Sequence, residues 1–310
     1  MKPSPFEYHG PSTVDEAVGV LAEVGHTGKV LAGGQSLVPI LNMRLAAPDH
    51  LVDINGVAGL DTIEVTSSHV RVGALVRHAR LEQDEPAYDA LPLLRQALVN
   101  VAHPVIRNRG TTLGSIMHAD PSGEMPAILA LTGGLVEAAS VRGTRHIPVG
   151  ELFAGPLETT LAPDELAVAV RFDRFPAGTG TAFAEIARRH GDYALAGVAA
   201  AVQVADDGTI GHARAGFVSL TLTPSVLDLT AVLAGVPADR LVDGSTPALD
   251  QVRAAVAAHI EPDDDIHATG EYRTVLATTL IGQVLAEATR RSLAAGAATG
   301  PAPTSQETTR

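Results

Sequence analysis

Two short segments of small residues hold the residue types best suited to bind an anion. The first is Ala32-Gly33-Gly34-Gln35-Ser36-Leu37, which follows an apolar stretch. Glycine lets backbone N–H groups approach a dianionic phosphate, because it has no side chain to obstruct them. Ser36 could add a hydroxyl donor, and a helix starting after it would add the positive end of its dipole. Taken alone, the segment is equally compatible with an ordinary strand-to-helix turn.

The second segment, Thr111-Thr112-Leu113-Gly114-Ser115, combines a glycine with hydroxyl-bearing side chains that could donate to a phosphate. Arg107 and Arg109 lie just upstream and could supply positive charge to a phosphate or to a partner. The alternative is a hairpin turn flanked by solvated arginines. Because two such segments occur in one chain, we expect a bound pyrophosphate and therefore a nucleotide cofactor.

Polar residues that follow the second segment could contact the rest of a nucleotide. Ala119 and Asp120 come first, and Glu124 lies a few positions beyond them. A carboxylate accepts hydrogen bonds from a diol, so both acids are candidates for contacts with ribose or ring hydroxyls. The alternative is a solvated loop whose acid caps a helix. Further along, segment 188–193 combines charge, a glycine and Tyr193, in a chain with only four tyrosines.

The motifs of several other enzyme classes are missing from the sequence. It contains no G-x-G-x-x-G, no complete P-loop, no H-E-x-x-H and no G-x-S-x-G, and its 12 histidines do not follow zinc-ligand spacing. These absences disfavour a Rossmann dinucleotide-binding unit, a kinase, a hydrolase and a metalloenzyme. We therefore predict no catalytic side chain and no metal ligand in this chain.

Charge and composition exclude further classes of function. The 310-residue chain carries 35 acidic and 22 basic side chains, a formal net charge of −13, which disfavours nucleic acid and anionic lipid as partners. It has no cysteine, so any iron–sulfur cluster in the same assembly must belong to another chain. Without a signal peptide or an apolar run long enough for a transmembrane segment, we expect a soluble cytoplasmic protein.

Hydrophobic periodicity indicates the elements that position these segments. A helix is expected over 14–24, between a Ser-Thr N-cap and a glycine stop. Around the first segment the pattern predicts strand 29–32, helix 38–45 and strand 51–54. Alternating residues then predict a hairpin over 63–76 that turns at Ser67-Ser68. The remaining elements of this half are helix 91–101, the strand pair 135–138 and 145–149, and strand 166–172.

The pattern breaks over 175–180, where we expect a domain boundary. Beyond it the sequence predicts apolar segments over 194–204 and 213–220, followed by helices near 225–234, 247–260 and 271–292. The predicted organisation is an N-terminal domain over 1–176, with subdomains of about 1–57 and 58–176, a C-terminal domain over 177–292, and a disordered tail over 293–310.

The chain resembles the FAD-binding medium subunits of molybdenum hydroxylases, the family of the carbon monoxide dehydrogenase medium subunit and the xanthine dehydrogenase flavin domain. The segment 32–39 resembles the first flavin loop of that family, and 108–124 resembles the second. Arg189-His190-Gly191-Asp192-Tyr193-Ala194-Leu195 resembles the motif that opens the family's C-terminal domain. The resemblance extends over roughly residues 1–290 and differs at Leu113, where the family usually has a glycine.

The resemblance implies an α+β (α/β) fold: a two-subdomain FAD-binding domain of the vanillyl-alcohol-oxidase (PCMH) type, and a smaller C-terminal domain with an antiparallel sheet and helices. The two loops would hold the FAD pyrophosphate, Glu124 would contact the flavin nucleotide, and Tyr193 would approach the isoalloxazine ring. Molybdenum-molybdopterin and [2Fe-2S] clusters would reside on a large and a small partner subunit, in an assembly with two copies of each chain. FAD would pass electrons from the clusters to an external acceptor.

Two alternatives stay open from the residues alone. A self-contained FAD oxidase or dehydrogenase would need a base near the flavin, for which His190 and Tyr193 are the candidates. A flavin-free assembly or nucleotide-binding module would use the same turns only structurally. The substrate of the complete enzyme is not encoded here, because in this family the molybdenum subunit selects it.

Overall fold

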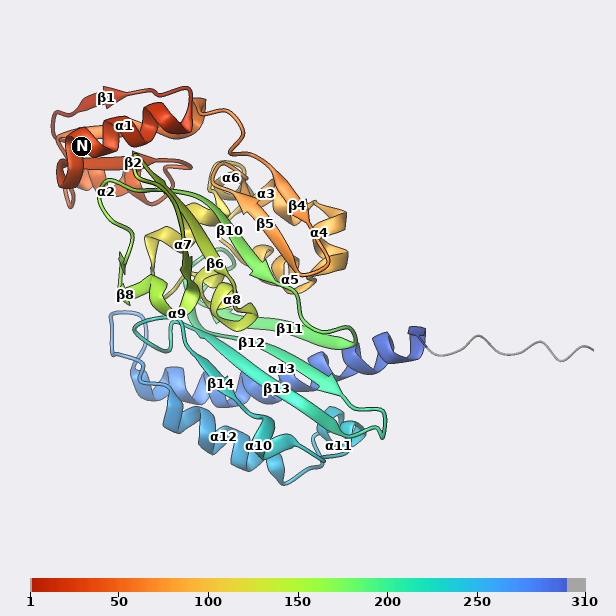
Figure 1. Ribbon diagram of the computed structural model, residues 1–310. Coiled ribbons are helices and arrows are strands. Elements are labelled where there is room, and N and C mark those ends of the chain that lie inside the picture. Colours follow the sequence, from red (N-terminus) through yellow and green to blue (C-terminus); the bar gives the residue numbers. More distant parts are fainter. Residues whose placement is uncertain (1, 300–310) are drawn as a thin grey trace, which may run out of the picture.

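The computed structural model describes residues 2–299, which build three main sheets along the chain (Figure 1). The first is a parallel sheet in the order β1 (Glu7–His9), β3 (His50–Asp53), β2 (Gly28–Leu31). Helix α1 (Val14–Val24) packs on it through buried Ala17, Val18 and Leu21, and a hydrogen bond to the Thr13 side chain caps its first turn. The short η1 (Gly25–Thr27), α2 (Leu37–Met43) and η2 (Ile54–Gly56) complete this unit.

The second sheet has five strands in the order β4 (Ile63–Val65), β5 (His69–Gly73), β10 (Leu166–Asp173), β6 (Leu135–Ser140), β7 (Gly143–Pro148), and every pair is antiparallel. At its centre, Glu137 of β6 accepts hydrogen bonds from Arg71 and Arg171 at 2.5–3.1 Å. Helices fill the long excursion between β5 and β6: α3 (His78–Glu82), α4 (Glu85–Ala90), α5 (Leu93–Leu98), α6 (Pro104–Arg107), α7 (Thr112–His118) and α8 (Glu124–Thr132). Helix α9 (Val149–Leu152) and the small hairpin of β8 (Phe153–Gly155) and β9 (Glu158–Thr159) precede β10.

The third sheet is an antiparallel meander of β11 (Thr179–Ala187), β12 (Ala194–Val204), β13 (Ile210–Val218) and β14 (Val226–Asp228). Helix α13 (Gly270–Thr299) lies along β11 and β12, and α12 (Ala248–His259) packs beside it (Figure 1). The short helices α10 (Thr230–Leu233) and α11 (Ala238–Val242) complete the C-terminal core. The approach of α13 is close, because a Cβ atom on Gly180 of β11 would meet the backbone of Ala288 and Ser292.

Helix α8 packs against β12 and β13 and joins the two halves of the chain. A Cβ atom on Gly216 of β13 would lie 3.3 Å from Leu131 Cβ and 3.4 Å from Ala127 O, so the glycine brings helix and sheet together. Arg214 Nη2 also donates to Leu131 O at 3.2 Å. The Ser219 amide donates to Pro121 O at 2.9 Å, which ties the end of β13 to the loop before α8.

The predicted fold class is confirmed, with three local corrections. The helix expected near 225–234 begins as strand β14, because residues 226–228 pair with β13 at the sheet edge, and only α10 is helical there. The helix expected over 91–101 is shorter, since α5 begins after Pro92 and ends at Leu98. The predicted tail overlaps α13, which continues to Thr299, and the rest of that tail lies outside the described residues. Positions 57/58 and 176/177 lie in connections between sheets, whereas position 292/293 lies within α13.

Candidate functional site

The two predicted loops touch each other through their backbones. A Cβ atom at Gly33 would lie 2.6 Å from Arg109 O and 2.8 Å from Gly110 Cα, so only glycine permits this approach. Gly34 has a φ of +74°, a conformation that residues with side chains rarely adopt. The turn between β2 and α2 therefore lies directly against the turn that leads into α7.

Unpaired amides of the first loop are the feature best suited to an anion. Within residues 2–299, the backbone N–H groups of residues 33–36 donate to no backbone or side-chain acceptor. The Val38 amide begins the helical hydrogen-bond pattern of α2 by donating to Gly34 O at 3.0 Å. Ser36 is the N-cap of α2 but makes no side-chain cap bond, so its hydroxyl is not used for capping. A run of amide donors at a helix start is a favourable environment for a phosphate.

Arg77 and Asn55 hold the two loops in this arrangement. Asn55 Nδ2 donates to Ala32 O at 2.9 Å, and Arg77 Nη2 donates to Asn55 Oδ1 at 2.6 Å. Arg77 Nη1 donates to Arg109 O at 2.6 Å. One guanidinium therefore bonds both a carbonyl beside the second loop and Asn55, the side chain that holds the first loop. Neither residue was predictable from the sequence, because neither lies in a motif and their contacts span more than twenty positions.

The second loop is shaped by the N-cap of α7. Thr111 Oγ1 accepts a hydrogen bond from the Gly114 amide at 3.2 Å, and a Cβ atom on Gly114 would lie 2.5 Å from that oxygen. Leu113, which stands where a glycine is usual, is only 2% exposed and packs in the hydrophobic core. Its side chain therefore does not fill the loop.

Two residues predicted as donors at this loop are instead buried and bond to other residues of the protein. Thr112 is fully buried, its Oγ1 shares a hydrogen bond with His78 Nδ1 at 3.2 Å, and its amide bonds Val76 O. Thr112 therefore does not supply the hydroxyl expected from the sequence. Arg107 is also buried and pairs with Glu82 at 2.8 Å, which removes it as a source of free charge. Arg109 is exposed and keeps its charge available.

A cluster of acids lies at the other end of α7. The helix ends at His118, and its C-cap Ala119 has a φ of +53°. Asp120 follows, and its carboxylate accepts a hydrogen bond from the Ser122 amide at 2.9 Å. Glu124 opens α8 and is only 7% exposed. Burial, with a further contribution from the charge of Asp120, raises the pKa of Glu124 to about 7.

Glu185 and Tyr193 bring the C-terminal half of the chain to this cluster. Burial and the charge of Glu124 raise the pKa of Glu185 to about 8, and its Oε2 is buried with no hydrogen-bond partner among residues 2–299. Burial and the carboxylates of Asp120 and Glu124 raise the pKa of Tyr193. Asp120, Glu124 and Tyr193 were predicted from the sequence, whereas Glu185 was not. Glu185 could have been recognised in the sequence as an acidic residue within the largely apolar segment that forms β11.

The segment that precedes Tyr193 also contacts the N-terminal half. Gly191 has a φ of +87°, and a Cβ atom there would lie 2.5 Å from the His103 ring. The rings of His103 and His190 meet edge to face with centroids 6.4 Å apart. The predicted site residues therefore form two groups, a backbone cradle at residues 33–36 and 109–115 and an acidic cluster around Tyr193, with α7 running from one to the other.

Comparisons with known proteins agree with this architecture. Residues 4–174 match the family described as "FAD binding domain in molybdopterin dehydrogenase", and residues 181–288 match "CO dehydrogenase flavoprotein C-terminal domain". The chain is 38% identical over 294 residues to the 6-hydroxypseudooxynicotine dehydrogenase complex subunit alpha of Paenarthrobacter nicotinovorans, covering 94% of this chain and 97% of that protein. It is 33% identical to the carbon monoxide dehydrogenase medium chain of Afipia carboxidovorans, covering 94% and 99%.

A solved structure supports the same assignment. Carbon monoxide dehydrogenase from Hydrogenophaga pseudoflava superposes with a TM-score of 0.86 at 34% sequence identity, covering 94% of this chain and 99% of that chain. Two domain matches, full-length relatives and a full-length structural match agree with one another. The chain therefore belongs to the family of FAD-binding medium subunits of molybdopterin-dependent dehydrogenases.

Proposed function

We propose that the cradle at residues 33–36 and 109–115 holds the pyrophosphate of FAD and that the acidic cluster around Tyr193 lies beside the flavin. The observation that carries this proposal is the run of unpaired amides in the first loop, packed against the second loop at Gly33. These donors, with the exposed Arg109, suit a doubly charged group. Helix α7 has seven residues, a rise of about 10 Å, so one rigid element separates the two groups.

The individual side chains have distinct proposed roles. Ser36 and Ser115 add hydroxyl donors at the cradle, whereas Gln35 closes the first turn by donating to Gly33 O at 3.0 Å. Ala32 and Leu37 flank the turn without polar side chains. Ala119 turns the chain at the end of α7, and Asp120 and Glu124 are positioned to accept hydrogen bonds from nucleotide hydroxyls. Glu124 and Glu185 can each hold a proton near neutral pH, because burial raises both of their pKa values.

When bound, FAD takes single electrons from iron–sulfur clusters and releases electron pairs to an acceptor, which is the chemistry of an electron-transfer subunit. The chain itself has no cysteine to hold a cluster. Its contribution is to bind the flavin and to control the charges and protons around it. The family assignment favours this function over a self-contained oxidase and over a flavin-free module.

The partners follow from the family. A medium subunit assembles with a large molybdopterin subunit and a small iron–sulfur subunit, which carry the other cofactors. We further propose two copies of each chain and an external electron acceptor, on the basis of the resemblance, and a cytoplasmic location. No helix in the described part of the chain has the length and apolar character needed to cross a membrane. Since relatives act on a nicotine derivative, caffeine and carbon monoxide, we propose a small molecule of one of these kinds as substrate of the complete enzyme.

The test is flavin retention in a Gly33→Ala variant, measured as flavin absorbance per purified chain, with and without coexpressed partner subunits. We expect most of the flavin to be lost, because the added Cβ would force the two loops apart. Gly19→Ala is the matched control, since a Cβ there meets nothing within 4 Å. Circular dichroism checks that both variants fold. Full flavin content in a folded Gly33→Ala protein would refute the proposed cradle.

A further inference from the structure

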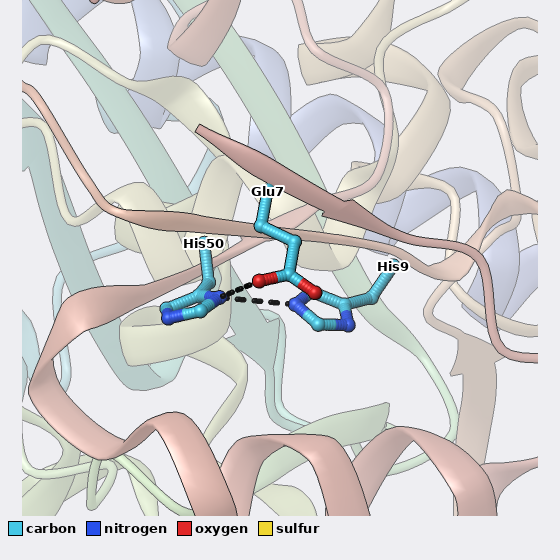
Figure 2. A group of neighbouring side chains, drawn as sticks. All are labelled: Glu7, His9 and His50. Atoms are coloured by element: carbon cyan, nitrogen blue, oxygen red, sulfur yellow. Dashed lines mark hydrogen bonds and ion pairs between the residues drawn. The ribbon is translucent and has the colours of Figure 1, made fainter. Parts of the chain in front are cut away.

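Three metal-ligand side chains gather on the first sheet, away from the cradle and the acidic cluster. Glu7 and His9 lie on β1 and His50 lies on β3, where the parallel register places Glu7 beside His50 (Figure 2). Residues two apart on a strand share a face, so Glu7 and His9 project to the same side. Figure 2 shows the carboxylate of Glu7 directed toward both imidazole rings.

The donor atoms are separated by distances close to those of a coordination shell. His9 Nε2 lies 3.1 Å from His50 Nδ1, and His50 Nδ1 lies 3.7 Å from Glu7 Oε2. One donor atom from each residue lies within 4.8 Å of the others. Ligands at about 2.0–2.1 Å from a tetrahedral zinc ion are about 3.3–3.4 Å apart, so only small side-chain adjustments are required.

The local electrostatics also suit a cation. Within residues 2–299, no arginine or lysine forms an ion pair with Glu7, whose side chain is 68% exposed. His50 is 26% exposed, which leaves the cluster open to a metal ion from solvent. Two imidazole nitrogens and one carboxylate favour Zn²⁺ and its transition-metal neighbours, whereas Mg²⁺ and Ca²⁺ prefer all-oxygen sites.

We propose that Glu7, His9 and His50 form a binding site for a divalent transition metal ion, with Zn²⁺ as its natural occupant. The ion would replace the direct hydrogen bond between the two imidazoles and leave a fourth position for water. Because β1 has three residues and, among residues 2–299, pairs with β3 alone, the metal would fasten this edge strand to the sheet. The sequence spacing did not predict this site, since residue 50 joins the other two only through strand pairing.

The test is calorimetric titration of the chelator-treated full-length chain with ZnCl₂ near neutral pH. We expect one saturable site per chain, with affinity lowered at least about tenfold in His9→Ala and in His50→Ala. His146→Ala is the matched control, because His146 is an exposed histidine on β7, outside the cluster. The control should bind zinc as the parent chain does. MgCl₂ should produce no saturable heat.

A second measurement keeps the result independent of folding defects. His9→Gln preserves the size and polarity of the side chain but removes the imidazole, and circular dichroism reports whether the variant folds. Anomalous scattering at the zinc edge in crystals of the chain or its complex should place the ion among the three side chains. Absence of saturable zinc binding, or binding that is equally strong in folded His9→Ala, His9→Gln and His50→Ala proteins, would overturn the proposal.

Discussion

Replacement of Glu185 by glutamine should remove a marked pH dependence from the stability of this chain. Because the native state raises the pKa of Glu185 from 4.5 to about 8, folding favours the protonated carboxyl. The native state therefore binds a proton that the unfolded state has already released, and stability falls as pH rises between these two values. The full difference corresponds to about 5 kcal/mol, of which about 2 kcal/mol falls between about pH 6 and pH 8.

The assay is urea unfolding of the flavin-free chain at a series of pH values, followed by circular dichroism because the sequence has no tryptophan. Glutamine does not titrate, so the stability of Glu185→Gln relative to the parent should increase steadily up to about pH 8 and then level off. Glu158→Gln, at an exposed glutamate on β9, serves as the control and should run parallel to the parent. A Glu185→Gln curve parallel to the parent over the whole range would refute the assignment of a buried, protonated carboxyl.

Three further substitutions test other parts of the structure. Glu137→Gln should lower the free energy of unfolding by about 3 kcal/mol, measured by urea denaturation, because two arginines lose their shared carboxylate. Gly180→Ala should lower the melting temperature sharply by forcing α13 away from β11, and unchanged melting would contradict that packing. Gly191→Ala should cost about 1–3 kcal/mol and reduce flavin content, since its Cβ would overlap the His103 ring; normal stability and flavin content would show that this contact is dispensable.

Long, periodic segments were predictable from the sequence because their own pattern determines them. Helix α1 matches its predicted bounds, and the apolar run of β12 falls where it was expected. The short helices α3, α4 and α6 and the three-residue strand β14 were not predicted, because their few residues carry no period and depend on tertiary contacts. Length is not the whole reason, since the three-residue β4 was predicted as part of its hairpin and the nine-residue β11 was not.

The residues of the candidate site also differ in whether the sequence alone could reveal them. The glycines at 33 and 34 were evident because a special backbone geometry requires that residue type. Arg77 and Asn55 were not, since nothing local indicates that their side chains reach a loop across the fold. Thr112 shows the opposite error: its hydroxyl looks available in the sequence but faces the buried His78.

The glycine contact between α8 and the third sheet would constrain electron transfer in a subunit with FAD bound at the proposed site. Gly216 lets the helix approach the sheet directly, while the Ser219 amide and Arg214 hydrogen-bond to carbonyls on the N-terminal side. Such packing resists hinge opening, because any displacement breaks several contacts together. Electron tunnelling slows steeply with distance. A redox centre held between these two halves would therefore keep a constant tunnelling distance to its donor through every turnover, and the acceptor would have to reach it without domain opening.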